Sequence, residues 1–92
     1  MNQQITYLPY YQPEQYKRLL QIVDDKDSFT ENWEDWNKNF IEFKSEMDKK
    51  GIECKEVIVD VEELHNYCVL NQLENNKLNR ELFALKMSSI LK

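Results

Sequence analysis

Glycine is nearly absent from this sequence, in which Gly51 is the only glycine among 92 residues. Phosphate-binding loops, dinucleotide-binding loops and nucleophile elbows each need glycines at fixed spacing, where the backbone turns sharply or approaches a phosphate. None of these motifs can be built around a single glycine. We therefore predict no catalytic residue and expect that the protein is not an enzyme.

Cysteine and histidine are almost as scarce, and Cys54, Cys68 and His65 are the only ones present. Two cysteines are too few for a secreted disulfide scaffold, and in a reducing compartment they are expected to be buried apolar side chains. Structural zinc sites usually have four ligands and gather their cysteines in close pairs, a pattern missing here. We predict no metal site and no cofactor. The alternative is a small metal-binding or thiol-dependent protein that uses Cys54, His65 and Cys68 together.

Long apolar runs and an excess of basic residues are also missing. No apolar run approaches the ~18 residues of a membrane span, and the first four residues do not match the basic start of a signal peptide. A cytoplasmic protein with no membrane contact is therefore expected. With 12 Lys and Arg against 17 Asp and Glu, the net charge is -5. Such a protein gains nothing from the counterion release that drives nucleic-acid binding, so direct binding to DNA or RNA is not expected.

The residues that are present favour a folded protein. Hydrophobic residues make up 41% of the chain and aromatic residues 12%, a content that disordered segments lack. The length predicts one small globular domain spanning residues 1–92. Charge is unevenly spread, because residues 1–63 carry fifteen acids and eight bases, whereas residues 64–92 carry two acids and four bases. This asymmetry is compatible with self-association or with a basic partner for the first part.

Apolar spacing and capping residues predict four helices. The first begins at Pro13 and ends near residue 24. The second begins near residue 30, with Ser28 or Thr30 as its N-cap, and is closed by Gly51 in a left-handed conformation. The third spans residues 61–70 and has Asp60 as its N-cap, and the fourth begins at residue 75 or 76 and runs to the C-terminus.

One strand is predicted over residues 52–59, because the β-branched residues Val57, Ile58 and Val59 follow one another at its end. Three consecutive apolar residues indicate burial on both faces of that strand. A strand needs a partner, and residues 3–8 are the only candidate within the chain, although two copies could also pair strand to strand. The predicted fold is therefore α+β and mostly helical, with about four helices and a small two-stranded sheet in the order β-α-α-β-α-α.

The last predicted helix carries two apolar stripes. Leu78, Leu82 and Leu85 form one stripe, and Phe83, Met87 and Ile90 form the other. Two stripes exceed what one small core needs, so either the helix lies between other elements or one stripe faces a partner subunit. We place the candidate oligomer interface on Phe83, Met87 and Ile90.

An acidic segment surrounds two tryptophans at the start of the second predicted helix. A tryptophan with an acidic border is typical of a contact site for a basic protein, whereas a buried pair would belong to the core. The candidate protein-binding residues are Asp27, Glu31, Trp33, Glu34, Asp35 and Trp36. Acids near a helix start also stabilise the helix dipole, which is a purely structural explanation for several of them.

Three features carry a resemblance to known sequences: the run Pro13-Glu14-Gln15-Tyr16, the pair Trp33 and Trp36, and the strand-to-helix run over residues 57–64 followed by Tyr67-Cys68. In these features the chain resembles a group of short uncharacterised bacterial proteins. The resemblance implies a bacterial origin, and the group supplies no activity to carry over.

These observations together favour a small acidic protein-interaction domain without catalytic activity. It would act as a homodimer, or as an inhibitor or immunity-type protein that covers a basic surface of its partner. Its specific role does not follow from the sequence.

Overall fold

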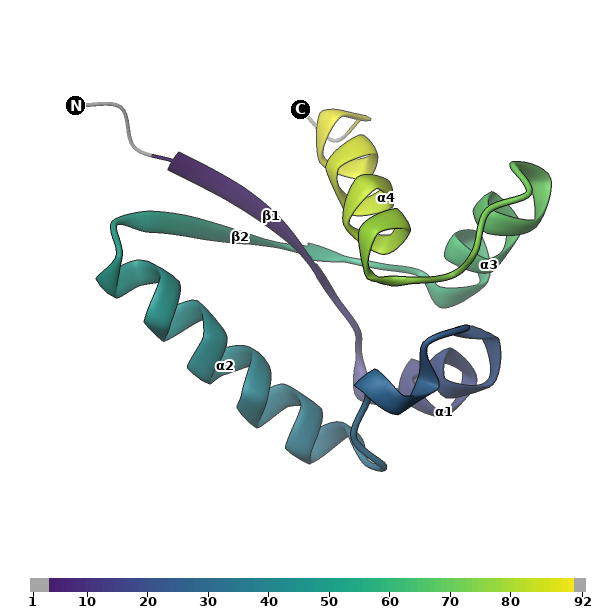
Figure 1. Ribbon diagram of the computed structural model, residues 1–92, viewed down its shortest axis with the longest axis horizontal. Coiled ribbons are helices and arrows are strands. Elements are labelled where there is room, and N and C mark those ends of the chain that lie inside the picture. The colour runs from purple at the N-terminus through teal and green to yellow at the C-terminus, as the bar shows by residue number, and fades with distance from the viewer. Residues whose placement is uncertain (1–3, 91–92) are drawn as a thin grey trace.

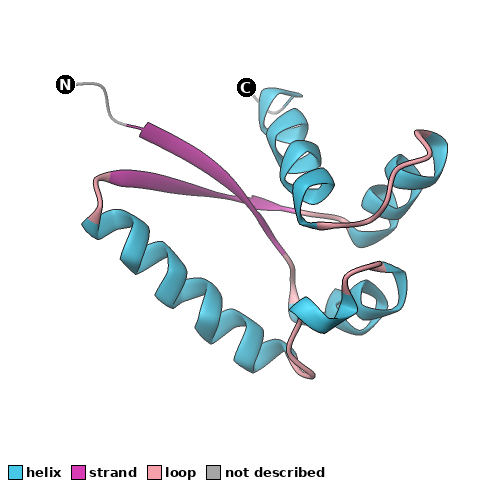
Figure 2. Ribbon diagram, viewed as in Figure 1, coloured by secondary structure: helices cyan, strands magenta, loops and turns pink. Residues whose placement is uncertain are grey.

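The computed structural model describes residues 4–90, with the side chain of Ile90 outside the described part. The strands and α-helices follow one another in the predicted order, β-α-α-β-α-α, and form an α+β fold dominated by helices (Figures 1 and 2). In chain order they are β1 (Gln4–Tyr10), α1 (Pro13–Ile22), a short 3-10 turn (Lys26–Ser28), α2 (Trp33–Lys49), β2 (Ile52–Ile58), α3 (Val61–Leu70) and α4 (Lys77–Ile90). None of the helices within residues 4–90 is long and apolar enough to cross a membrane.

The two strands are parallel and pair in register from Gln4 opposite Ile52 to Tyr10 opposite Ile58. Parallel pairing requires a crossover, and the segment containing α1 and α2 provides it. The long helix α2 lies on one side of the sheet and α4 on the other, while α1 and α3 pack together at the end where the strands finish (Figure 1). The N-terminal segment is thus the strand partner, as expected, and β1 continues through Pro9 because a two-stranded sheet leaves each strand a free edge.

Burial along β2 corrects one prediction. Val57 and Val59 are buried, but Ile58 between them is 63% exposed. Successive side chains of a strand point to opposite faces, and no element covers the second face of β2 at this position well enough to bury Ile58. The expectation of burial on both faces was therefore wrong.

The helix ends follow local capping rules, with one correction. Asp60 caps α3 as predicted, because its Oδ1 accepts hydrogen bonds from the amides of Glu62 and Glu63. Gly51 has φ 81° and turns the chain between α2 and β2. The N-cap of α2 is Asn32, whose side chain accepts from the amide of Asp35 at 2.8 Å, and not Ser28 or Thr30. Ser28 instead ends the 3-10 turn.

The hydrophobic core lies where α1, α3 and α4 meet the ends of the strands. Leu19 and Leu64 have no exposed surface, and Val61 is 1% exposed. The other members of the buried cluster are Tyr11, Tyr16, Val23, Val59, Cys68 and Phe83. Burial of branched and aromatic side chains from three helices and from the residues that follow the two strands holds α1 and the C-terminal half together.

A polar clamp joins the loop after α1 to the start of α4. The amide of Asp24 donates to the carbonyl of Asn75 at 2.9 Å, and the amide of Asn75 donates to Oδ2 of Asp24 at 2.7 Å. Next to them, Arg80 donates from both terminal nitrogens to the carboxylate of Asp25, each at 2.7 Å. The clamp fixes the position of α4 relative to the 3-10 turn.

Candidate functional site

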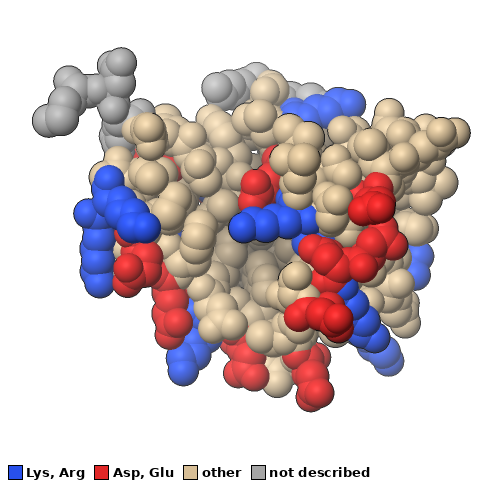
Figure 3. Space-filling view, in the orientation of Figure 1, with Lys and Arg blue, Asp and Glu red and all other residues tan. Residues whose placement is uncertain are grey.

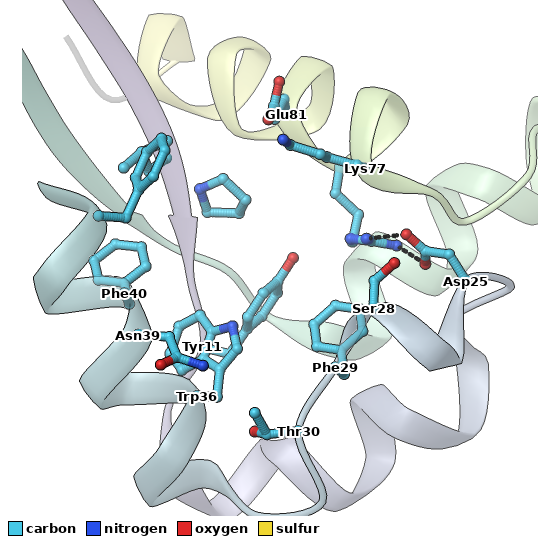
Figure 4. A pocket seen from close by; sticks show the side chains of 14 residues that line it. Tyr11, Asp25, Ser28, Phe29, Thr30, Trp36, Asn39, Phe40, Lys77 and Glu81 are labelled. Carbon is cyan, nitrogen blue, oxygen red and sulfur yellow. Dashed lines mark hydrogen bonds and ion pairs between the residues drawn. The ribbon is translucent and has the colours of Figure 1, made fainter. Parts of the chain in front are cut away.

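A hollow of about 470 Å³ lies between α2 and α4, over the end of β1 and beside the 3-10 turn. It opens on the face shown in Figure 3, where acidic side chains gather below it and to its right. Four separate stretches of chain form its walls, and Figure 4 shows their side chains converging on the same space. A volume of this size is within the usual range for ligand sites.

Aromatic rings form most of the apolar wall. Trp36 has the central position, with its ring centroid 5.2 Å from that of Phe40 and 5.3 Å from that of Tyr11. Phe29 closes the side formed by the 3-10 turn, and its centroid lies 6.5 Å from that of Tyr11. Phe43 lies at the open end and is 45% exposed. These tilted arrangements are favourable for aromatic pairs and leave ring faces and edges toward the hollow.

The charged side chains of the hollow balance one another. Arg80 is only 5% exposed, and its guanidinium lies 4.9 Å from the centroid of Phe29 while it holds Asp25. Hydrogen bonding to Arg80 keeps the pKa of Asp25 below its usual range. Lys77 and Glu81 add one charge of each sign at the rim (Figure 4). The four groups sum to zero, so the hollow itself has no preference for an ionic ligand.

Tyr11 is the least satisfied polar side chain of this wall. It is 2% exposed, and its hydroxyl has no hydrogen-bond partner among residues 4–90. In Figure 4 this hydroxyl points into the space enclosed by the lining residues. Burial raises the pKa of Tyr11 well above its usual value of 10.0, and Arg80 offsets this effect only in part. The phenol is therefore neutral at pH 7 and keeps a proton to donate.

The acidic residues predicted for protein binding divide into two groups. Asp27 and Glu31 border a second recess, which is also lined by Lys26 and shares Phe29 and Thr30 with the hollow. Both acids are exposed. Glu34 and Asp35 are also exposed but line neither recess. The structure therefore places Asp27 and Glu31 at the recess that adjoins the aromatic hollow, and it places neither Glu34 nor Asp35 at either recess.

The two predicted tryptophans have different surroundings. Trp33 is half-buried and its indole nitrogen donates to the carbonyl of Tyr11 at 2.8 Å, so it holds the end of β1. Trp36 is half-buried as well, packs against the core and also lines the hollow. A ligand in the hollow would contact Trp36. Trp33 acts as a support.

The residues of the alternative metal or thiol site do not form a ligand group. No set of three His, Cys, Asp or Glu side chains within the described range is placed to hold a metal ion. Cys54 lies in the middle of β2, opposite Thr6, whereas Cys68 is buried against the core from α3. Burial raises the pKa of both thiols, which disfavours the reactive thiolate.

On α4, the apolar stripe predicted to form the interface faces the core, and the other stripe is exposed. Phe83 is 5% exposed in the core and Met87 packs against the core, while the side chain of Ile90 lies outside the described residues. The assignment of Phe83 and Met87 to a surface between subunits is therefore corrected, because this stripe is needed inside the domain. The exposed stripe consists of Leu78, Leu82 and Leu85, which are 63%, 46% and 47% exposed.

Sequence reasoning did not identify Tyr11, Phe29 or Arg80 as site residues. Arg80 and Asp25 are 55 positions apart, and no local pattern links them. Tyr11 had one available signal, since it lies two residues before a helix that begins with Pro13 and so lies where the strand must end. That signal indicates a boundary and carries no information about a binding site.

Comparison of the chain with protein families, with curated proteins and with solved structures finds no match.

Proposed function

We propose that this protein is a non-catalytic interaction domain that binds a basic segment of a partner protein, with an aromatic side chain of that segment anchored in the hollow. The observation that supports this most strongly is the junction of the two recesses at Phe29 and Thr30. An aromatic pocket of balanced charge there adjoins the exposed carboxylates of Asp27 and Glu31. Protein-binding hot spots typically place an anchor side chain in a desolvated pocket, and complementary charge beside the pocket steers the partner. Lys26 lines the second recess together with the two acids, so the charged groups there sum to one negative charge.

The carboxylates of Asp27 and Glu31, here called the acidic border, indicate that the partner segment is positively charged. Neither Asp27 nor Glu31 takes part in a side-chain hydrogen bond or ion pair recorded among residues 4–90. Lysine or arginine residues that flank the anchor would face these carboxylates and speed the encounter. The proposal includes a cytoplasmic location and inhibition of a basic target protein.

Selection from a displayed random-peptide library tests the proposal. Peptides retained by the immobilised protein are expected to combine an aromatic residue with Lys or Arg. The double variant Asp27→Lys and Glu31→Lys should retain them about tenfold less well, because two favourable charge pairs become repulsive.

Glu34→Lys is the matched control, because it reverses a charge in the same acidic segment at a position that lines neither recess. It should leave retention unchanged. Peptides without basic residues, or equal losses in the control and the double variant, would reject the acidic border as the contact.

The leucine stripe of α4 favours a second candidate function, namely self-association. Three leucines at one helix face are exposed in this fold, and apolar stripes of this kind usually mark contact surfaces. A second copy is a suitable partner, because residues 64–92 carry a net positive charge and residues 1–63 a net negative one. Two copies could then associate head to tail.

Sedimentation equilibrium checks this second candidate. Leu82→Glu should shift an assembly to monomer by placing a charge in a buried apolar contact. Ile41→Glu makes a similar change on α2, where Ile41 is 58% exposed, and should leave the mass unchanged. A wild-type protein that is monomeric throughout the concentration range would contradict self-association.

A further inference from the structure

The hydroxyl of Tyr11 indicates which type of side chain the partner anchors in the hollow. This inference rests on the proposed function. We propose that the hollow accepts a tyrosine side chain of the partner, whose phenol oxygen accepts a hydrogen bond from the hydroxyl of Tyr11. The inference combines the buried hydroxyl, the aromatic walls and the charge balance of the hollow.

The unpaired hydroxyl defines which kind of atom must enter. A buried hydroxyl without a partner costs about 1–3 kcal/mol in the free protein, and a ligand that supplies the partner recovers that cost. Arg80 nearby offers only donors, and its two terminal nitrogens already bind Asp25. What Tyr11 lacks is an acceptor, since its pKa is raised and the phenol keeps its proton.

The aromatic walls and the charge balance narrow the anchor to one residue type. Trp36, Phe40 and Phe29 present ring surfaces that favour another aromatic ring over a flexible polar chain. Among the large aromatic side chains, phenylalanine has no polar atom and the indole of tryptophan can only donate. A carboxylate would supply an acceptor, but it would bring an unpaired charge into a site whose own charges sum to zero. Of these three large aromatic side chains, only tyrosine combines a ring, neutrality and an acceptor.

Entry of the ring requires side chains of the lining to move. The hydroxyl of Tyr11 is closed to solvent in the unbound protein. Lys77 extends along the mouth of the hollow and is exposed (Figure 4). Its flexible chain can adopt other rotamers at little cost, and its displacement opens the path between α4 and Phe29.

Two peptides that differ by one oxygen atom test the inference by calorimetry. The probes are Ac-Lys-Arg-Tyr-Arg-Lys-amide and the same peptide with phenylalanine at its centre. Wild-type protein should bind the tyrosine peptide about fivefold more tightly than the phenylalanine peptide. This is the ratio of dissociation constants expected for one neutral hydrogen bond. In Tyr11→Phe the two peptides should bind equally, because the donor is gone and the ring remains.

The outcomes separate this inference from the proposed function. If wild-type protein binds both peptides equally, or if the tyrosine preference persists in Tyr11→Phe, the inference is overturned while capture of a basic aromatic segment stands. If neither peptide binds, both proposals fail. Phe43→Ala serves as a second variant with Tyr11 intact. It should weaken the binding of both peptides and leave the ratio of their affinities unchanged, because in the proposed complex Phe43 contacts the ring of the anchor and not its oxygen.

Discussion

Replacing Asp25 with asparagine is expected to lower the free energy of unfolding by about 3 kcal/mol, the lower end of the range for breaking a buried ion pair. The substitution keeps the shape of the side chain but leaves the guanidinium of Arg80 buried without a counter-charge. The side chain of Arg80 is 6% exposed and that of Asp25 is 26% exposed. Because the cation is the more buried partner, loss of the carboxylate is costly. Urea denaturation followed by Trp fluorescence measures the change.

A double variant provides the control for this prediction. Asp25→Asn combined with Arg80→Met removes both charges, and it should recover part of the lost stability, since an apolar replacement of a buried pair is often nearly neutral. A double variant that is less stable than Asp25→Asn alone would show that the other bonds of Arg80, to the carbonyl and side chain of Asn75, dominate.

The same ion pair predicts a pH dependence of stability. The pKa of Asp25 is lower in the folded protein than its ordinary value, and the hydrogen bond from Arg80 is the main cause. A depressed pKa means that the contribution is complete above the unfolded-state pKa of about 3.9 and declines as the pH falls toward the folded-state pKa. Asp25→Asn should lack this part of the acid dependence.

Leu64→Ala should destabilise the protein by about 3 kcal/mol, within the range measured for leucine removal from well-packed cores. Leu64 has no exposed surface and packs in α3 among the side chains that join three helices to the strand ends. The loss includes the transfer of the removed atoms and the cavity that remains. Thermal and urea unfolding at matched protein concentration would measure it.

The matched control lies on the same helix. Leu70, the last residue of α3, is 81% exposed, and Leu70→Ala should change the unfolding free energy by no more than about 0.5 kcal/mol. Equal losses at Leu64 and Leu70 would contradict the assignment of the core to the inner face of α3.

The sequence predicts this fold where the signals are local. The junction from Gly51 through Asp60 shows why: a left-handed glycine ends α2, β-branched residues follow, and a capping aspartate starts α3 at the predicted residue. The element order followed from such signals, together with the need of β2 for a strand partner. Parallel pairing, the crossover by α1 and α2, and the exposure of Ile58 depend on tertiary packing, which spacing alone does not specify.

The candidate site was predictable only in part, for the same reason. Asp27, Glu31 and Trp36 were selected from one acidic aromatic segment, and the fold places them at or beside the hollow. Tyr11 and Arg80 come from distant positions and gain their significance from burial. The two stripes of α4 were recognised, but deciding which one is exposed required the positions of the other elements, because both stripes have the same helical period.

The most direct test of the proposed interaction site is an amide chemical-shift titration of the labelled protein with Ac-Lys-Arg-Tyr-Arg-Lys-amide. The largest shifts are expected at Thr30, Glu31 and Asn39 and at the indole proton of Trp36, since these groups line the hollow or its acidic border. Shifts confined to the leucine stripe of α4, or no shifts at saturating peptide, would contradict the assignment of the hollow as the binding site.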